Sequence, residues 1–77
     1  MTRLVKIGQR YRSTEAPVCV WEVVELVELN GIAHAVLVLL RDPWTRKTVS
    51  LAGLLNRGSF ELVADAAEPA GRERQRR

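Results

Sequence analysis

The chain has few side chains that could serve as a nucleophile, a general base or a metal ligand. His34 is the only histidine and Cys19 the only cysteine in the 77 residues. One histidine without a carboxylate at suitable spacing forms neither a metal site nor an acid–base pair. A hairpin that pairs Leu29 with Ile32 brings Cys19 near Asp42, far from His34, so the two cannot form a nucleophilic pair. We therefore expect a non-enzymatic protein without a metal ion or a cofactor.

Three glutamates, Glu22, Glu25 and Glu28, recur every third residue and are a second candidate for chemistry. Clustered carboxylates can bind a hard cation, but this spacing is far more typical of a solvated strand face. Gly53 and Gly58 stand alone, without the Gly-Lys-Thr motif of a phosphate loop. We interpret the glutamates as a solvated strand face and expect no phosphate loop.

Aromatic residues beside basic residues are the strongest candidates for binding. Trp44 is flanked by three bases, and an indole among cations can stack on a nucleobase or form a protein hot spot. A structural role in which Trp44 covers one end of the fold stays open. Tyr11 lies between two arginines, and Trp21 is interpreted as a core residue. The predicted contacts in this part of the chain are Arg10, Tyr11, Arg12, Arg41, Trp44, Arg46 and Lys47.

The net charge of +3 is spread over the folded part and a basic C-terminal segment. Up to Ala64 the chain has eight basic and six acidic residues. The segment 65–77 has no apolar period and is predicted to be a disordered tail. Its arginines suit either a phosphate-binding arm or a solubilising end; they are Arg72, Arg74, Arg76 and Arg77. The charge permits nucleic-acid binding without requiring it.

The element that positions these residues is a predicted long hairpin. Asn30-Gly31 between two apolar runs is the strongest short-range signal for a type I′ turn. Val18 to Leu29 is then one strand that bulges near Val23-Val24, although the glutamate spacing leaves a helix as the alternative. Ile32 to Arg41 is the returning strand. Apolar residues on both of its faces indicate burial on both sides, with a second subunit covering one face.

The remaining elements are short. Thr2 to Ile7 and Gln9 to Ser13 are predicted strands, with Tyr11 as an apolar anchor, and a loop follows at Thr14 to Pro17. Asp42 to Lys47 is predicted as a turn because proline suits its second position. The rest of the domain is predicted as a strand at Lys47 to Ser50, one helical turn of the 3-10 type capped by Ser50, and a closing strand at Ser59 to Val63.

This order of elements resembles the SH3-like small barrels. The resemblance rests on Gly8-x-x-Tyr11, Trp21-Glu22-Val23, the Asn30-Gly31 hairpin and the turn before Phe60. It implies an all-β fold of about five antiparallel strands closed into a barrel over residues 1–64, with the tail at 65–77. The superfold hosts many unrelated functions and therefore does not supply one.

Two functions remain as expectations. The first is a protein-interaction module that self-associates through the apolar hairpin, using Ile32, His34, Val36 and Val38. The second is a nucleic-acid-binding barrel that uses Trp44, the surrounding bases and the arginine tail. The most apolar stretch, Ile32 to Leu40, is far shorter than the ~20 residues of a membrane-spanning helix. We expect a soluble, cytoplasmic protein with no membrane partner.

Overall fold

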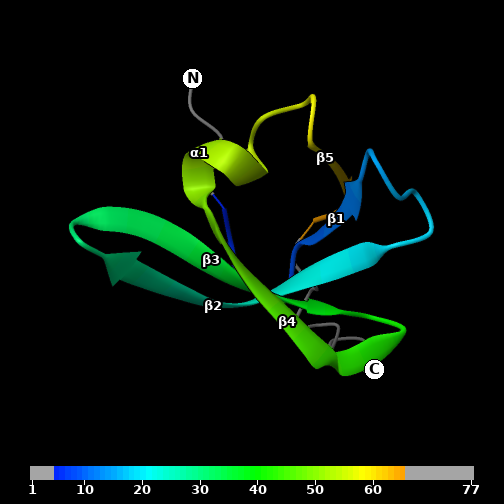
Figure 1. Ribbon diagram of the computed structural model, residues 1–77, viewed down its shortest axis with the longest axis horizontal. Coiled ribbons are helices and arrows are strands. Elements are labelled where there is room, and N and C mark those ends of the chain that lie inside the picture. The colour runs from blue at the N-terminus through cyan, green and yellow to red at the C-terminus, as the bar shows by residue number, and fades with distance from the viewer. Residues whose placement is uncertain (1–4, 66–77) are drawn as a thin grey trace, which may run out of the picture.

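The computed structural model of the chain describes residues 5–65, and within them the fold is all-β. The strands are β1 (Arg10–Ser13), β2 (Val20–Leu29), β3 (Ile32–Leu39), β4 (Asp42–Ser50) and β5 (Phe60–Ala64), with a short helix α1 (Leu51–Leu54) between the last two. They form one antiparallel sheet in the order β4-β3-β2-β1-β5 (Figure 1). The all-β class is confirmed. In residues 5–65 the sheet does not close into the expected barrel, since β4 and β5 remain its two edges.

The hairpin of β2 and β3 dominates the sheet and projects beyond the rest of the fold (Figure 1). Its two turn residues have positive φ, 52° at Asn30 and 79° at Gly31. A type I′ turn requires this backbone, which asparagine and glycine tolerate better than other residues. The turn sets Leu29 opposite Ile32, as predicted.

The predicted bulge in β2 is confirmed and decides which face each glutamate occupies. The pairing of β2 with β3 shifts between Val23 and Glu25, so Val24 is an extra residue in the ladder. Strand side chains alternate between the two faces, and one extra residue reverses the alternation. Glu22 and Glu25 therefore lie on the same face although they are three residues apart. The helix alternative for this segment is wrong.

The core lies on one side of the sheet, which we call the inner face. It is formed by Val5, Tyr11, Trp21, Val23, Ala35, Leu37 and Leu54, all buried. The interpretation of Trp21 as a core residue is confirmed. The outer face is the opposite side, and it includes His34, Val36 and Val38 on β3. These residues are only half-buried. On β3 only Ala35 and Leu37, both on the inner face, are buried, so the expected burial on both sides is wrong.

The helix α1 closes one end of the inner face with Leu54, whose side chain is fully buried. Ser50 caps it as predicted, because its hydroxyl oxygen accepts a hydrogen bond of 3.0 Å from the Gly53 amide. The Leu55 amide donates to the Leu51 carbonyl at 2.9 Å. This spacing of four residues makes the turn α-helical, which corrects the expected 3-10 type. Across residues 5–65 there is no helix with the length and apolarity that spanning a membrane requires.

Two predicted elements are wrong. Asp42 to Lys47 is not a turn: the chain reverses at Leu40-Arg41, and β4 begins at Asp42. Val38 pairs with Arg46 while Leu39 pairs with Asp42, so the residues between Asp42 and Arg46 form a wide irregularity. An irregularity in an edge strand can accommodate proline, which has no amide hydrogen to donate. The expected strand at Thr2 to Ile7 is also absent over its described part, because Val5 to Ile7 contains no strand residue.

The packing of Leu37 gives a direct test of this core. Its side chain is 0% exposed and lies beside Val23 across the β2–β3 ladder. We expect Leu37→Ala to lower the free energy of unfolding by about 2–5 kcal/mol, because it leaves a cavity. Leu26→Ala, in the same hairpin but 43% exposed, should cost much less. Urea denaturation followed by tryptophan fluorescence measures both, and equal losses would contradict this assignment of the core.

Candidate functional site

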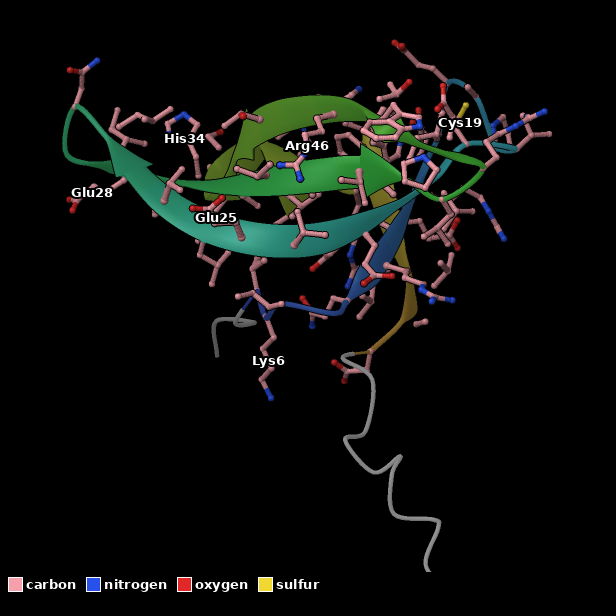
Figure 2. The ribbon with its side chains drawn as sticks, turned by 90° about the horizontal axis from the view of Figure 1, so that it is seen from below. Lys6, Cys19, Glu25, Glu28, His34 and Arg46 are labelled. Carbon is pink, nitrogen blue, oxygen red and sulfur yellow. The ribbon has the colours of Figure 1, made fainter. Side chains whose placement is uncertain are left out.

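The outer face of β1 to β4 brings together most of the residues that the sequence singled out. Cross-strand pairing places side chains of paired residues on the same face. One row across the sheet runs Arg10, Glu22, Val38 and Arg46, from β1 to β4. Arg46 and His34 lie on this face together with Glu25 (Figure 2). The bases predicted to bind nucleic acid and the valines predicted for self-association thus share one surface.

The charges in this row are only partly neutralised by other residues of 5–65. The Arg10 Nε donates to Glu22 Oε1 at 3.2 Å, with the two side chains 49% and 29% exposed. This exposed pair adds little to stability because water and salt screen it. Arg46 makes no ion pair or side-chain hydrogen bond with any other residue of 5–65. Its guanidinium is available for a partner.

A neighbouring row is polar at its edges and apolar at its centre. It runs Glu25, Val36 and Thr48 from β2 to β4. Toward the hairpin tip the outer face becomes apolar, with Leu29 opposite Ile32, which is 57% exposed. The His34 Nδ1 lies 2.8 Å from the Ile32 carbonyl oxygen. The predicted self-association residues occupy alternate positions of β3 on this face and so form one continuous strip: Ile32, His34, Val36 and Val38.

Trp44 does not cover the end of the fold, because its side chain is 94% exposed. It lies in the irregularity of β4, where the Thr45 hydroxyl donates to Asp42 Oδ2 at 2.8 Å. Arg41 occupies the adjacent turn and is also exposed. The structure thus presents the indole to solvent on the same strand as the exposed Arg46.

Two of the predicted contacts lie elsewhere. Lys47 pairs with Leu37 and so belongs to the inner face, opposite to Arg46. Its Nζ lies 4.5 Å from the centroid of the Trp21 ring and 5.7 Å from that of Phe60. Tyr11 is buried, and its hydroxyl donates to Gln9 Oε1 at 3.0 Å. Tyr11 is thus buried in the core, whereas Lys47 stays exposed but lies on the face opposite to Arg46.

Arg12 extends the outer face at β1, where it pairs with Val20 on one side and Glu61 on the other. Its Nε is buried and has no hydrogen-bond partner among the described residues. The same is true of Trp21 Nε1 on the inner face. Arg72, Arg74, Arg76 and Arg77 lie outside the described residues, and so does nearly all of the predicted tail.

Cys19 and His34 are far apart, at opposite ends of the molecule (Figure 2). His34 pairs with Val27, whereas Cys19 precedes β2 altogether. The bulge also shifts the expected neighbour of Cys19 by one position, since the Leu40 amide donates to the Val20 carbonyl. Among residues 5–65, no three His, Cys, Asp or Glu residues are grouped so that they could bind a metal ion.

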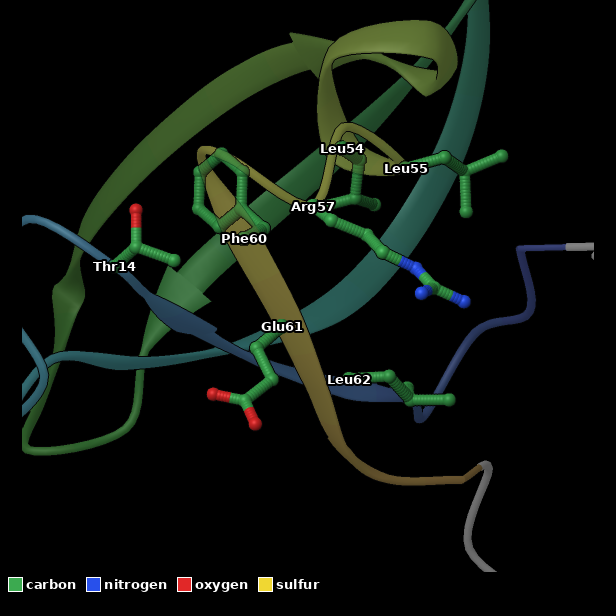
Figure 3. Close-up of a pocket in the computed structure, with 7 residues that line it drawn as sticks. All are labelled: Thr14, Leu54, Leu55, Arg57, Phe60, Glu61 and Leu62. Atoms are coloured by element: carbon green, nitrogen blue, oxygen red, sulfur yellow. The ribbon is translucent and has the colours of Figure 1, made fainter.

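A cavity of about 440 Å³ between α1 and β5 is a feature that the sequence reasoning missed (Figure 3). Its lining residues are Thr14, Leu54, Leu55, Arg57, Phe60, Glu61 and Leu62. The Arg57 side chain runs between those of Leu55 and Leu62 (Figure 3). The alternation of Phe60 and Leu62 signals an apolar strand face, but only the folded topology sets it against α1. The cavity offers an apolar wall beside one cation and one carboxylate.

The chain matches no protein-family model, and comparisons with curated proteins and with solved structures likewise give no match. The function therefore has to be inferred from the geometry of these surfaces.

The opposite placement of Lys47 and Arg46 can be tested by matched substitutions on one strand. We expect Lys47→Gln to lower the free energy of unfolding by about 0.5–1 kcal/mol, because the ammonium loses its contact with the Trp21 ring. Arg46→Gln, on the other face, should leave stability unchanged. Thermal unfolding monitored by circular dichroism compares them. A larger effect of Arg46→Gln would contradict the assigned faces.

Proposed function

We propose that the chain is a small, non-enzymatic binding module that self-associates through the outer face of the β2–β3 hairpin. The observation that carries this proposal is the strip of Ile32, His34, Val36 and Val38, which is apolar but for His34 and stays partly open to solvent. Apolar surface removed from water contributes about 25 cal/mol per Å². A second molecule would bury the strip and provide the second buried face that the composition of β3 favours.

The projecting tip of the hairpin supports the same proposal. Leu29 and Ile32 are large apolar residues that remain exposed there on the outer face. Contiguous apolar residues at the surface of a small domain are typical of interaction sites. Since Leu29 and Ile32 continue the strip on the outer face, an interface there would extend to the tip.

The resemblance to SH3-like barrels belongs to this proposal as well. Five antiparallel strands with a helical turn before the last one support it. Closure into a barrel would require β4 and β5, the two edges of the sheet, to pair. We further propose a cytoplasmic setting, which a single cysteine suits because thiols stay reduced there.

The first test is a charge placed at the centre of the strip. We expect the wild-type chain to self-associate at high micromolar concentration and Val36→Lys to be monomeric at the same concentration. The ammonium would face Glu25 on the neighbouring strand, so the fold should tolerate it. Size-exclusion chromatography with light scattering measures the molar mass.

Leu26→Lys is the matched control, because Leu26 is on the opposite face of the same hairpin, where it pairs with Ala35. It should associate as the wild type does. Urea denaturation of both variants confirms that they are folded. A wild-type chain that stays monomeric over the whole concentration range would contradict self-association.

A second candidate function, nucleic-acid binding, is favoured by the exposure of Trp44. The Trp44 indole is 94% exposed, so its apolar surface is in contact with water. Stacking on a nucleobase would bury that surface and contribute about 1–3 kcal/mol per base to binding. Arg41 and Arg46 are exposed bases on the same part of the fold. The mild net charge makes this candidate the weaker of the two.

Titration with mixed single-stranded RNA and with duplex DNA tests this candidate through tryptophan fluorescence anisotropy. Binding through Trp44 should saturate, weaken steeply with salt because phosphates release counterions, and be abolished by Trp44→Ala. Removal of residues 72–77 should weaken it. Trp44→Phe serves as the control that retains a stacking ring, with binding followed on labelled RNA. Absence of binding at low salt would eliminate nucleic acid as the ligand.

A further inference from the structure

The outer face carries opposite charges on either side of its apolar strip. Val38 lies between Glu22 on β2 and Arg46 on β4, and Val36 lies between Glu25 and Thr48. Neighbouring strands are about 4.8 Å apart, so each row spans about 10 Å. In both rows a carboxylate occupies the β2 side and a hydrogen-bond donor the β4 side.

These groups keep capacity for an external partner. Arg46 has no polar side-chain partner within residues 5–65. Glu22 accepts from Arg10 through Oε1, and no other polar contact of Glu22 occurs among the described residues. Glu25 forms none. A partner for this face therefore has to supply a cation over β2, an anion over β4 and apolar atoms between them.

A second copy of the chain meets this requirement in one orientation. If the two outer faces pack about a two-fold axis parallel to β3, then β4 of each copy lies over β2 of the other. Each Arg46 then meets Glu22 and each Thr48 meets Glu25, while the valines of both copies meet on the axis. A two-fold axis perpendicular to the strands would instead stack β2 on β2, bringing carboxylates together, which costs free energy.

We infer that the chain forms a symmetric dimer whose two-fold axis runs along β3, with Arg46 of each copy paired to Glu22 of the other. This inference rests on the proposed self-association and adds its geometry. Packed sheets lie about 10 Å apart, a gap that arginine and glutamate side chains span together. Because sheets twist, only the central rows align, so the interface is small and the affinity micromolar.

Charge reversal on the two sides of the strip tests the geometry. In a dimer of E22R, each of the two contacts between position 22 and position 46 would bring two arginines together. In a dimer of R46E, each of these contacts would bring two glutamates together. We expect each variant to dissociate at least about tenfold more readily than the wild type. An equimolar mixture of E22R and R46E restores both attractive pairs and should form mixed dimers of wild-type affinity. Sedimentation velocity at low salt measures all three samples.

The control is Glu28→Arg, the same change of charge on the same strand but on the inner side, where Glu28 pairs with Ala33. It should associate as the wild type does. If E22R does not fold because its new guanidinium lies beside Arg10, E22Q replaces it. A mixture of E22Q with R46E should still dimerise more tightly than R46E alone.

The outcomes separate the two claims. A wild-type dimer that is indifferent to both charge reversals overturns the proposed axis and leaves self-association standing. Recovery of association only in the mixture supports the axis. A wild-type chain that remains monomeric overturns self-association and the dimer geometry together.

Discussion

The register of the β2–β3 hairpin is the constraint on which the rest of the structure depends. The Asn30-Gly31 turn sets Leu29 opposite Ile32, and the extra residue at Val24 then reverses the alternation once. Because strand side chains alternate with a period of two, a slip of one residue would expose Leu37 and bury His34. The same register collects Glu22 and Glu25 on one face. Core and outer face are thus two consequences of one turn and one bulge.

The parts of the fold that local chemistry determines could be predicted from the sequence. The Asn30-Gly31 turn and the Ser50 cap each need particular residue types at one position, and both were found where expected. The turn expected at Asp42 to Lys47 was wrong. Proline has no amide hydrogen to donate, so it is also compatible with an edge strand. The closure of a sheet depends on contacts between distant segments, and the strand pattern alone did not show that β4 and β5 do not pair with each other.

The candidate site was predicted in part, for a similar reason. Trp44 was expected either to bind a partner or to cover one end of the fold, and its exposure excludes the second role. Lys47 follows Arg46 in sequence, but adjacent strand residues point to opposite faces, and Lys47 contacts the Trp21 ring on the inner face. The cavity between α1 and β5 was missed because Leu54 and Leu62, which both line it, are brought to one place only by the folded topology. The residues of the outer face are brought together by the pairing register between strands, which cannot be predicted from the types of neighbouring residues in the sequence.

Methyl resonances of the valines and leucines, followed by NMR as the full chain is diluted from millimolar to low micromolar concentration, test the central claim most directly. The account predicts concentration-dependent shifts at Val36 and Val38 and constant positions for Val23 and Leu37, which are fully buried. The same shifts should appear at Ile32 if the interface reaches the hairpin tip. Constant resonances for all outer-face methyl groups, or shifts confined to residues around the cavity at α1, would contradict self-association through the outer face.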